Sequence, residues 1–330
     1  MRRCHQMSPV TKPILEVDQV KKYFPIKSGF LKRTVANVQA VESVSVDVME
    51  GETLGVVGES GCGKSTFGRT ILGLESLTDG SIKFRGEEIG GLSERQLKKY
   101  KKEMQMIFQD PYASLNPRQR IGDALEEAFI IHTKLSKAER RQKVKELLVE
   151  VGLKEEHAER YPHEFSGGQR QRIGIARAVS LNPSLIVCDE AVSALDVSVQ
   201  AQIIQLLKEL QQSHQLTYLF ISHDLGVVKH ISDRVLVMYL GATAELAPAD
   251  QLFAKPLHPY TQALLSAIPR PVVGRKKERI RLKGELPNAA DYPSGCPFHT
   301  RCPLAHERCR QERPEWREVE EGHFVACHEV

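Results

Sequence analysis

The chain has 330 residues, enough for one large core with an appendage, and its 27% charged and 41% apolar residues are ordinary for a globular protein. A formal net charge of +4 is too small to indicate a nucleic-acid-binding protein. No run approaches the roughly 18 apolar residues that span a bilayer, and the basic start has no apolar stretch behind it. We therefore expect a cytoplasmic chain that reaches a membrane only through partner proteins.

The hydrophobic pattern predicts strands first and then an alternation of helices and strands. β-Branched runs over residues 13–60 predict strands, with an exposed hairpin or loop over residues 24–38. A short strand is predicted at 81–84, and the pattern from 92 to about 161 is helical. Further on, the predicted elements are strands at 185–188, 218–222 and 235–239 and a helix with an apolar stripe over 203–210.

This order of elements predicts a largely parallel α/β sheet interrupted by a helical insert near residues 110–165. Prolines become frequent beyond about residue 254, which predicts a separate C-terminal extension. The expected organisation is therefore a tail over 1–12, a main domain over 13–254 and an extension over 255–330.

Residues 58–66 match the phosphate-binding pattern G-x-x-x-x-G-K-[ST] in full, with Gly58, Glu59, Ser60, Gly61, Cys62, Gly63, Lys64, Ser65 and Thr66. A predicted strand precedes this loop and a predicted helix follows it, as the motif requires. The glycines let backbone N–H groups wrap a polyphosphate. Lys64 places a positive charge near its β- and γ-phosphates, and Ser65 offers a hydroxyl to Mg²⁺. The alternative is a glycine-rich turn that caps a helix.

Two carboxylates follow the apolar strand at 185–188, namely Asp189 and Glu190. At the carboxyl edge of a parallel sheet they face the phosphate loop. We expect Asp189 to hold Mg²⁺, directly or through water, and Glu190 to polarise an attacking water. Alone, the pattern more often marks a plain strand terminus, but downstream of a phosphate loop it is a strong indication of these roles.

About 23 residues before this acidic pair stands the run Phe165, Ser166, Gly167, Gly168 and Gln169. Ser166 is a good helix N-cap, and the two glycines leave the first N–H groups of the helix open to an anion. The run resembles the signature motif of ATP-binding-cassette (ABC) ATPases. In that family the signature of one subunit closes on the γ-phosphate held by another.

The resemblance implies ATP and Mg²⁺ as ligands and an α/β fold of the P-loop NTPase class. In this ABC-type nucleotide-binding domain, a RecA-like core carries an antiparallel β-subdomain and an α-helical insert, here followed by a small C-terminal extension. Gln109 matches the Q-loop glutamine, a Mg²⁺ ligand with Ser65 and Asp189 that couples to the membrane subunit. His223 matches the switch histidine, which contacts the γ-phosphate and acts with Glu190 and Gln109 in hydrolysis. The D-loop is matched by Ser193, Ala194, Leu195 and Asp196.

The residue that stacks on adenine has two candidates. Phe24 is the better match to the family aromatic, and Tyr23 is the competing assignment. An aromatic in a strand is also a common core residue.

Three further segments resemble the ATPases of dipeptide and oligopeptide importers. They are residues 108–118, residues 258–265, and residues 284–287 together with 295–302. The form of the first segment resembles the F-type member of the paired ATPases in these importers. The resemblance implies a heterodimer with a D-type sister, two permease subunits, an extracytoplasmic substrate-binding protein and a place on the cytoplasmic face of the membrane.

Four cysteines gather near the C-terminus: Cys296, Cys302, Cys309 and Cys327. In a reducing compartment such a group favours a metal or cluster site over disulfides. The tight C-x₂₋₄-C start of most zinc sites is absent, and four thiolates suit a [4Fe–4S] cluster. Family resemblance also points to a cluster, while Zn²⁺ and no metal remain alternatives. We expect this small domain not to touch the phosphates.

Two other function classes remain to be weighed against the importer ATPase. Soluble ABC ATPases of DNA repair or translation usually have two cassettes, coiled coils or strongly basic arms, which this chain lacks. A regulatory module that has lost hydrolysis is disfavoured because Glu190 and His223 are both present. The sequence does not identify the cargo.

Overall fold

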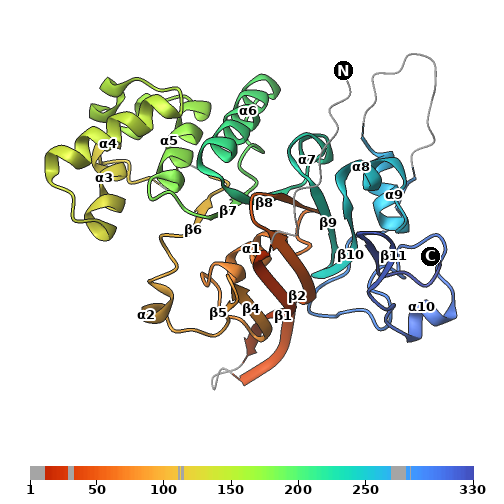
Figure 1. Ribbon diagram of the computed structural model, residues 1–330. Coiled ribbons are helices and arrows are strands. Elements are labelled where there is room, and N and C mark those ends of the chain that lie inside the picture. Colours follow the sequence, from red (N-terminus) through yellow and green to blue (C-terminus); the bar gives the residue numbers. More distant parts are fainter. Residues whose placement is uncertain (1–11, 29–32, 111, 113–114, 269–279, 283) are drawn as a thin grey trace, which may run out of the picture.

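A computed structural model describes residues 12–28, 33–110, 112, 115–268, 280–282 and 284–330. Most of the predicted N-terminal tail, residues 1–11, lies outside this part. Within it, the strands form two sheets with helices packed around them (Figure 1). No helix of the described residues is both long and apolar enough to cross a bilayer.

The larger sheet has eight strands in the order β11-β12-β10-β9-β3-β8-β7-β6. Its parallel part pairs β9, β3, β8, β7 and β6. These strands have the bounds β3 (Thr53–Val57), β6 (Met104–Ile107), β7 (Leu185–Asp189), β8 (Thr217–Ser222) and β9 (Arg234–Tyr239). Strands β3, β7 and β8 are buried along their whole length, as expected for parallel strands covered on both faces. The predicted parallel core is therefore confirmed.

Strand β6 corrects the prediction of continuous helix from residue 92 to 161. Its four residues pair in parallel with β7, from Met104 opposite Leu185 to Ile107 opposite Cys188. A short apolar run does not by itself distinguish a strand from a buried turn of helix. Here the run forms a strand because it can pair with the edge of β7 that is not paired with β8.

The smaller sheet is antiparallel, in the order β2-β1-β4-β5. Its strands are β1 (Pro13–Ser28), β2 (Arg33–Met49), β4 (Asp79–Phe84) and β5 (Glu87–Glu88). Strands β1 and β2 pair along nearly their full length, so the described parts of the segment predicted as a hairpin or loop, residues 24–28 and 33–38, are paired ends of these two strands. Helix α1 (Lys64–Ile71) and the short α2 (Glu94–Leu97) complete this part of the chain.

A group of helices separates β6 from β7 along the chain and lies at one end of the molecule (Figure 1). It consists of α3 (Ile121–His132), α4 (Lys137–Glu150), the 3₁₀ turns η1 (Glu155–Glu159) and η2 (Pro162–Glu164), and α5 (Gly167–Val179). The apolar stripe of α4 is buried through Val144, Leu147 and Leu148. After β7 come α6 (Val197–His214) and, beyond β8, α7 (Leu225–Ile231).

The C-terminal segment lies at the opposite end and is joined to the main sheet (Figure 1). Its elements are α9 (Pro259–Ser266), α10 (Glu307–Gln311), β11 (Arg317–Glu320) and β12 (His323–Val325). They follow β10 (Ala242–Pro248) and α8 (Ala249–Ala254). Strand β12 pairs antiparallel with β10, so two strands of the extension continue the sheet of the main domain. The extension predicted as separate therefore shares its sheet.

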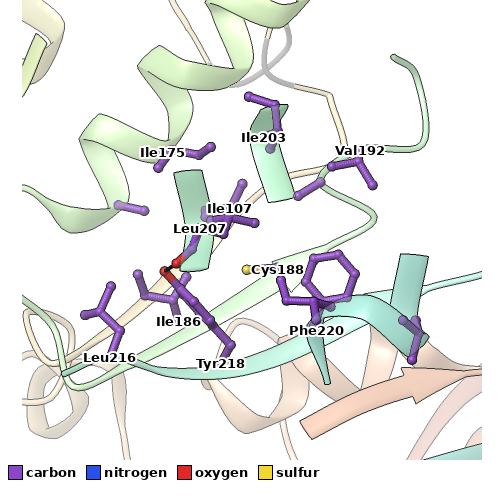
Figure 2. Packing of buried hydrophobic residues seen from close by; sticks show 14 of the residues in the cluster. Ile107, Ile175, Ile186, Cys188, Val192, Ile203, Leu207, Leu216, Tyr218 and Phe220 are labelled. Atoms are coloured by element: carbon purple, nitrogen blue, oxygen red, sulfur yellow. Dashed lines mark hydrogen bonds between the residues drawn. The ribbon is translucent and has the colours of Figure 1, made fainter. Parts of the chain in front are cut away.

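The main core lies between the parallel sheet and helices α5 and α6 (Figure 2). Ile186 and Cys188 of β7 pack with Ile203 and Leu207 of α6, all of them fully buried. The Tyr218 hydroxyl donates to the carbonyl oxygen of Leu207 at 3.0 Å, which removes the cost of burying that group. This packing fixes β7, and with it the two carboxylates at its end.

Candidate functional site

Residues 58–66 connect β3 to α1, and two of their glycines are required by the backbone. At Gly58 (φ 158°), an added Cβ would lie 2.2 Å from the carbonyl oxygen of Met238. At Gly63 (φ 100°), it would lie 2.0 Å from the carbonyl oxygen of Ala40. Neither backbone oxygen can move aside cheaply. The loop is therefore held tightly between β9 and β2.

The two polar side chains at the start of α1 point into this loop and toward β7. The buried Lys64 ammonium donates to the carbonyl oxygens of Gly58 (2.8 Å) and Glu59 (3.0 Å). The Ser65 hydroxyl donates to Oδ1 of Asp189 at 2.6 Å. Burial raises the pKa of Asp189 above its ordinary value, although the Ser65 bond lowers it. The predicted pairing of the phosphate loop with the first carboxylate is thus present.

Three side chains from different elements meet just beyond Asp189. Glu190 Oε2 accepts from Nε2 of Gln109 at 2.9 Å and lies 3.3 Å from Nδ1 of His223. Gln109 follows β6, Glu190 follows β7 and His223 follows β8, so the carboxyl ends of three neighbouring parallel strands bring them together. Half of the His223 side chain is exposed, so a ligand can reach the group.

The oxygen donors at this edge suit a hard cation. They are the Ser65 hydroxyl, the Asp189 carboxylate and the Gln109 amide oxygen, the ligand class that Mg²⁺ prefers. The donor chemistry therefore fits Mg²⁺.

Residues 166–169 begin α5 with a capping box. Ser166 Oγ accepts from the backbone N–H of Gln169 at 3.4 Å, and the Gln169 side chain accepts from the Ser166 N–H at 3.1 Å. Phe165 is buried against His157 at a ring separation of 5.3 Å. A Cβ at Gly168 would lie 2.6 Å from Cγ1 of Val199 in α6. Among the described residues, no hydrogen bond or ion pair joins this run to the phosphate loop.

The run Ser193 to Asp196 leads from Glu190 into α6. Ser193 Oγ donates to the carbonyl oxygen of Glu190 at 3.0 Å. Asp196 caps α6 by accepting from the N–H of Val199 at 3.0 Å, and its bond from Ser198 lowers its pKa. The segment therefore ties the position of Glu190 to α6.

The two candidate adenine-stacking residues have different surroundings. The Tyr23 hydroxyl donates to the buried carboxylate of Glu42, and burial raises the pKa of this phenol. The ring of Phe24 lies 4.6 Å from the ammonium of Lys22. Neither arrangement identifies the adenine contact, which remains a prediction.

The four C-terminal cysteines lie in one small domain but form no metal site. The N–H of Cys296 donates to the carbonyl oxygen of Cys309 at 2.8 Å. Burial raises the pKa of Cys296 to about 11 and also raises the pKa of Cys302 and Cys327, with a smaller effect from neighbouring thiols. Among described residues, no group of three or more His, Cys, Asp or Glu could hold a metal ion.

This arrangement does not support the predicted [4Fe–4S] cluster or its Zn²⁺ alternative. Binding either group would require the four thiols to ionise and to come within ligand distance of one metal centre.

The sequence reasoning missed a contact between the extension and the phosphate loop. Arg301, next to Cys302, forms a two-point ion pair with Glu59, with N–O distances of 2.6 and 3.2 Å. The hydroxyl of Tyr260 accepts from the N–H of Glu59 at 2.8 Å. No local sequence signal joins residues 242 positions apart.

Comparison with known proteins agrees with this geometry. Residues 41–193 match the family model described as ABC transporter, and residues 244–309 match oligopeptide/dipeptide transporter, C-terminal region. The oligopeptide transport ATP-binding protein AppF of Bacillus subtilis (strain 168) is 59% identical, over 96% of this chain and 97% of AppF. The di/tripeptide transport ATP-binding protein DppF of Pseudomonas aeruginosa (strain UCBPP-PA14) is 52% identical, over 96% and 97%.

A solved structure has the same fold over the cassette. It is a dimeric post-hydrolysis state of the ATP-binding cassette MJ0796 bound to ADP and Pi, with a TM-score of 0.64 at 28% identity. The match covers 71% of this chain and 98% of that one. The chain therefore belongs to the ATP-binding, ATP-hydrolysing subunits of ABC importers for oligopeptides and dipeptides.

Proposed function

We propose that this chain is one of two ATPases on the cytoplasmic face of a membrane, bound to two permease subunits. A D-type sister chain is the proposed second ATPase, and an extracytoplasmic binding protein delivers the peptide. The near-full-length similarity to AppF and DppF supports the peptide class. The F-type form of residues 108–118 supports the choice of a D-type partner.

The proposed roles follow from the meeting of Gln109, Glu190 and His223, which is the observation that carries this proposal. Lys64 holds the β- and γ-phosphates. Glu190 orients the attacking water and takes its proton, while Gln109 and His223 hold Glu190 and His223 also contacts the γ-phosphate. Ser65, Gln109 and Asp189 would hold Mg²⁺, which neutralises phosphate charge when bound.

The signature run is proposed to act on the nucleotide of the partner subunit. Its support is the N-terminus of α5, where two glycines precede Gln169 and leave backbone N–H groups for an anion. The MJ0796 structure with ADP and Pi is described as dimeric, which agrees with a site shared between two cassettes.

Reconstitution tests the assembly. The isolated chain should hydrolyse ATP weakly, and activity should rise when the D-type sister and the permeases are added. A matched mixture with a second portion of this chain in place of the sister tests whether a homodimer suffices. Full activity from a strictly monomeric chain would refute the shared site, and equal activity in the matched mixture would refute the need for a sister.

We also propose that the four cysteines bind one [4Fe–4S] cluster, a group that four thiolates suit. The support is that all four lie in one small domain near enough to influence each other's pKa. Binding of the cluster would require the four thiols to ionise and to move closer to one another. Anaerobically purified protein should then be brown and lose its colour in Cys302→Ser. Colourless protein with one equivalent of zinc, or metal-free protein with four titratable thiols, would refute the proposed cluster.

A further inference from the structure

The phosphate loop carries an acidic side chain at its second position, and this side chain is paired with the C-terminal extension. The Glu59 carboxylate accepts two bonds from the guanidinium of Arg301, at 2.6 and 3.2 Å. The Arg301 side chain is only 8% exposed, and that of Glu59 is 30% exposed. A two-point pair with such restricted access to water is stronger than an ordinary surface ion pair.

The extension makes a second bond to the same loop residue. Tyr260, in the first turn of α9, is fully buried, and its hydroxyl accepts from the Glu59 N–H at 2.8 Å. The carbonyl oxygen of Glu59 accepts from Lys64 at 3.0 Å. The carboxylate and N–H of Glu59 are thus held by the extension, and its carbonyl by the phosphate-binding lysine.

Both contacts come from one aromatic cluster that joins the extension to the main sheet. The rings of Tyr260 and Phe298 lie 4.8 and 5.1 Å from that of Tyr239 at the end of β9. The Arg301 guanidinium lies 5.9 Å from the Tyr239 ring. Figure 1 shows α9 beside β9 and β10. Arg301 and Tyr260 are therefore supported by rigid packing.

We propose that the C-terminal extension positions the phosphate loop for ATP through Arg301 and Tyr260, both acting on Glu59. They are positioning residues, since neither is among the groups assigned to the phosphates or the attacking water. Tyr260 fixes the loop backbone through the Glu59 N–H. Arg301 compensates a carboxylate that would otherwise add negative charge beside a polyphosphate.

The charge argument makes the effect of Arg301 depend on Glu59. Without Arg301, the Glu59 carboxylate is unpaired and opposes the binding of an anionic ligand. Removing this carboxylate as well takes away the repulsion, so the double change should bind nucleotide better than the single change. A role limited to supporting the fold predicts no such recovery.

The test measures the Kd of the full-length chain for a non-hydrolysable ATP analogue with Mg²⁺. We expect Arg301→Gln to raise this Kd about tenfold, and Glu59→Gln with Arg301→Gln to return it to within about threefold of wild type. Tyr260→Phe keeps the ring packing and should raise the Kd severalfold. Arg308→Gln, which removes an exposed pair with Glu312 in the same extension, is the matched control and should change nothing.

In the assembled transporter, kcat at saturating ATP should change less than about twofold in Arg301→Gln, whereas KM rises with Kd. The idea is wrong if Arg301→Gln and Tyr260→Phe both bind within twofold of wild type, or if the double variant binds no better than Arg301→Gln. If Arg301→Gln does not fold, Tyr260→Phe alone decides. The inference rests on the ATP site, and a wild-type chain that binds no nucleotide would refute that assignment instead.

Discussion

Glu190→Gln is the most direct test of the hydrolytic site. The substitution keeps the size of the side chain and one oxygen that can accept from Nε2 of Gln109, now 2.9 Å from Glu190. It removes the negative charge that lies 3.3 Å from His223 and the only proposed acceptor for the proton of water. Binding should therefore survive while the chemical step fails.

The size of the effect follows from the loss of a positioned base. General-base catalysis contributes about 10²- to 10⁴-fold, so turnover should fall at least about 10²-fold, equivalent to roughly 2.7 kcal/mol or more in the barrier. The bond from Lys64 to the loop carbonyl oxygen and the bond from Ser65 to Asp189 do not involve Glu190. The Kd for ATP should therefore stay within about threefold of wild type.

The assay compares single-turnover hydrolysis and ATP binding in the assembled transporter, with the exposed Glu209→Gln on α6 as a matched carboxylate control. Glu190→Gln should bind ATP and accumulate a closed dimer, whereas Glu209→Gln should behave as wild type. Wild-type hydrolysis by Glu190→Gln would refute the assignment of Glu190 as the base.

Three further predictions concern the backbone and the extension. Gly63→Ala places its Cβ 2.0 Å from the carbonyl oxygen of Ala40, so ATP binding measured by calorimetry should fall at least about tenfold, and unchanged binding would contradict the required approach. Gly168→Ala places its Cβ 2.6 Å from Cγ1 of Val199 on α6, a stiff β-branched side chain, so ATP binding should persist while dimer-dependent hydrolysis falls severalfold; equal loss in both would count against the shared site. Burial lowers the pKa of His258 from 6.5 to about 4. Between these pH values, His258 is protonated in the unfolded chain but not in the folded one. The free energy of unfolding should therefore drop by up to about 3 kcal/mol as pH falls through this range. Urea unfolding at pH 7 and pH 5 checks this. Nδ1 of His258 accepts from the N–H of Tyr260 as a helix cap, and Asn can cap the helix in the same way without titrating. His258→Asn should therefore show a smaller drop.

The sequence by itself determined the phosphate loop, the acidic pair and the helix start at Ser166. Each is a contiguous run whose chemistry depends on local backbone: glycines for a tight loop, carboxylates after an apolar strand and a Ser-Gly-Gly cap. The buried stripes of α4 and α6 were predictable for the same reason, since side chains spaced three and four apart share a helix face.

Other features were decided only by tertiary structure. The four residues of β6 became a strand because β7 offered a free edge. Gln109, Glu190 and His223 meet because three strands lie side by side, although the first two are 81 positions apart. Arg301 reaches Glu59 over 242 positions because β12 joins the sheet and the aromatic cluster fixes the extension against β9. Local sequence encodes the conformation of each segment, but contacts between distant segments depend on strand order and packing, which no single segment specifies.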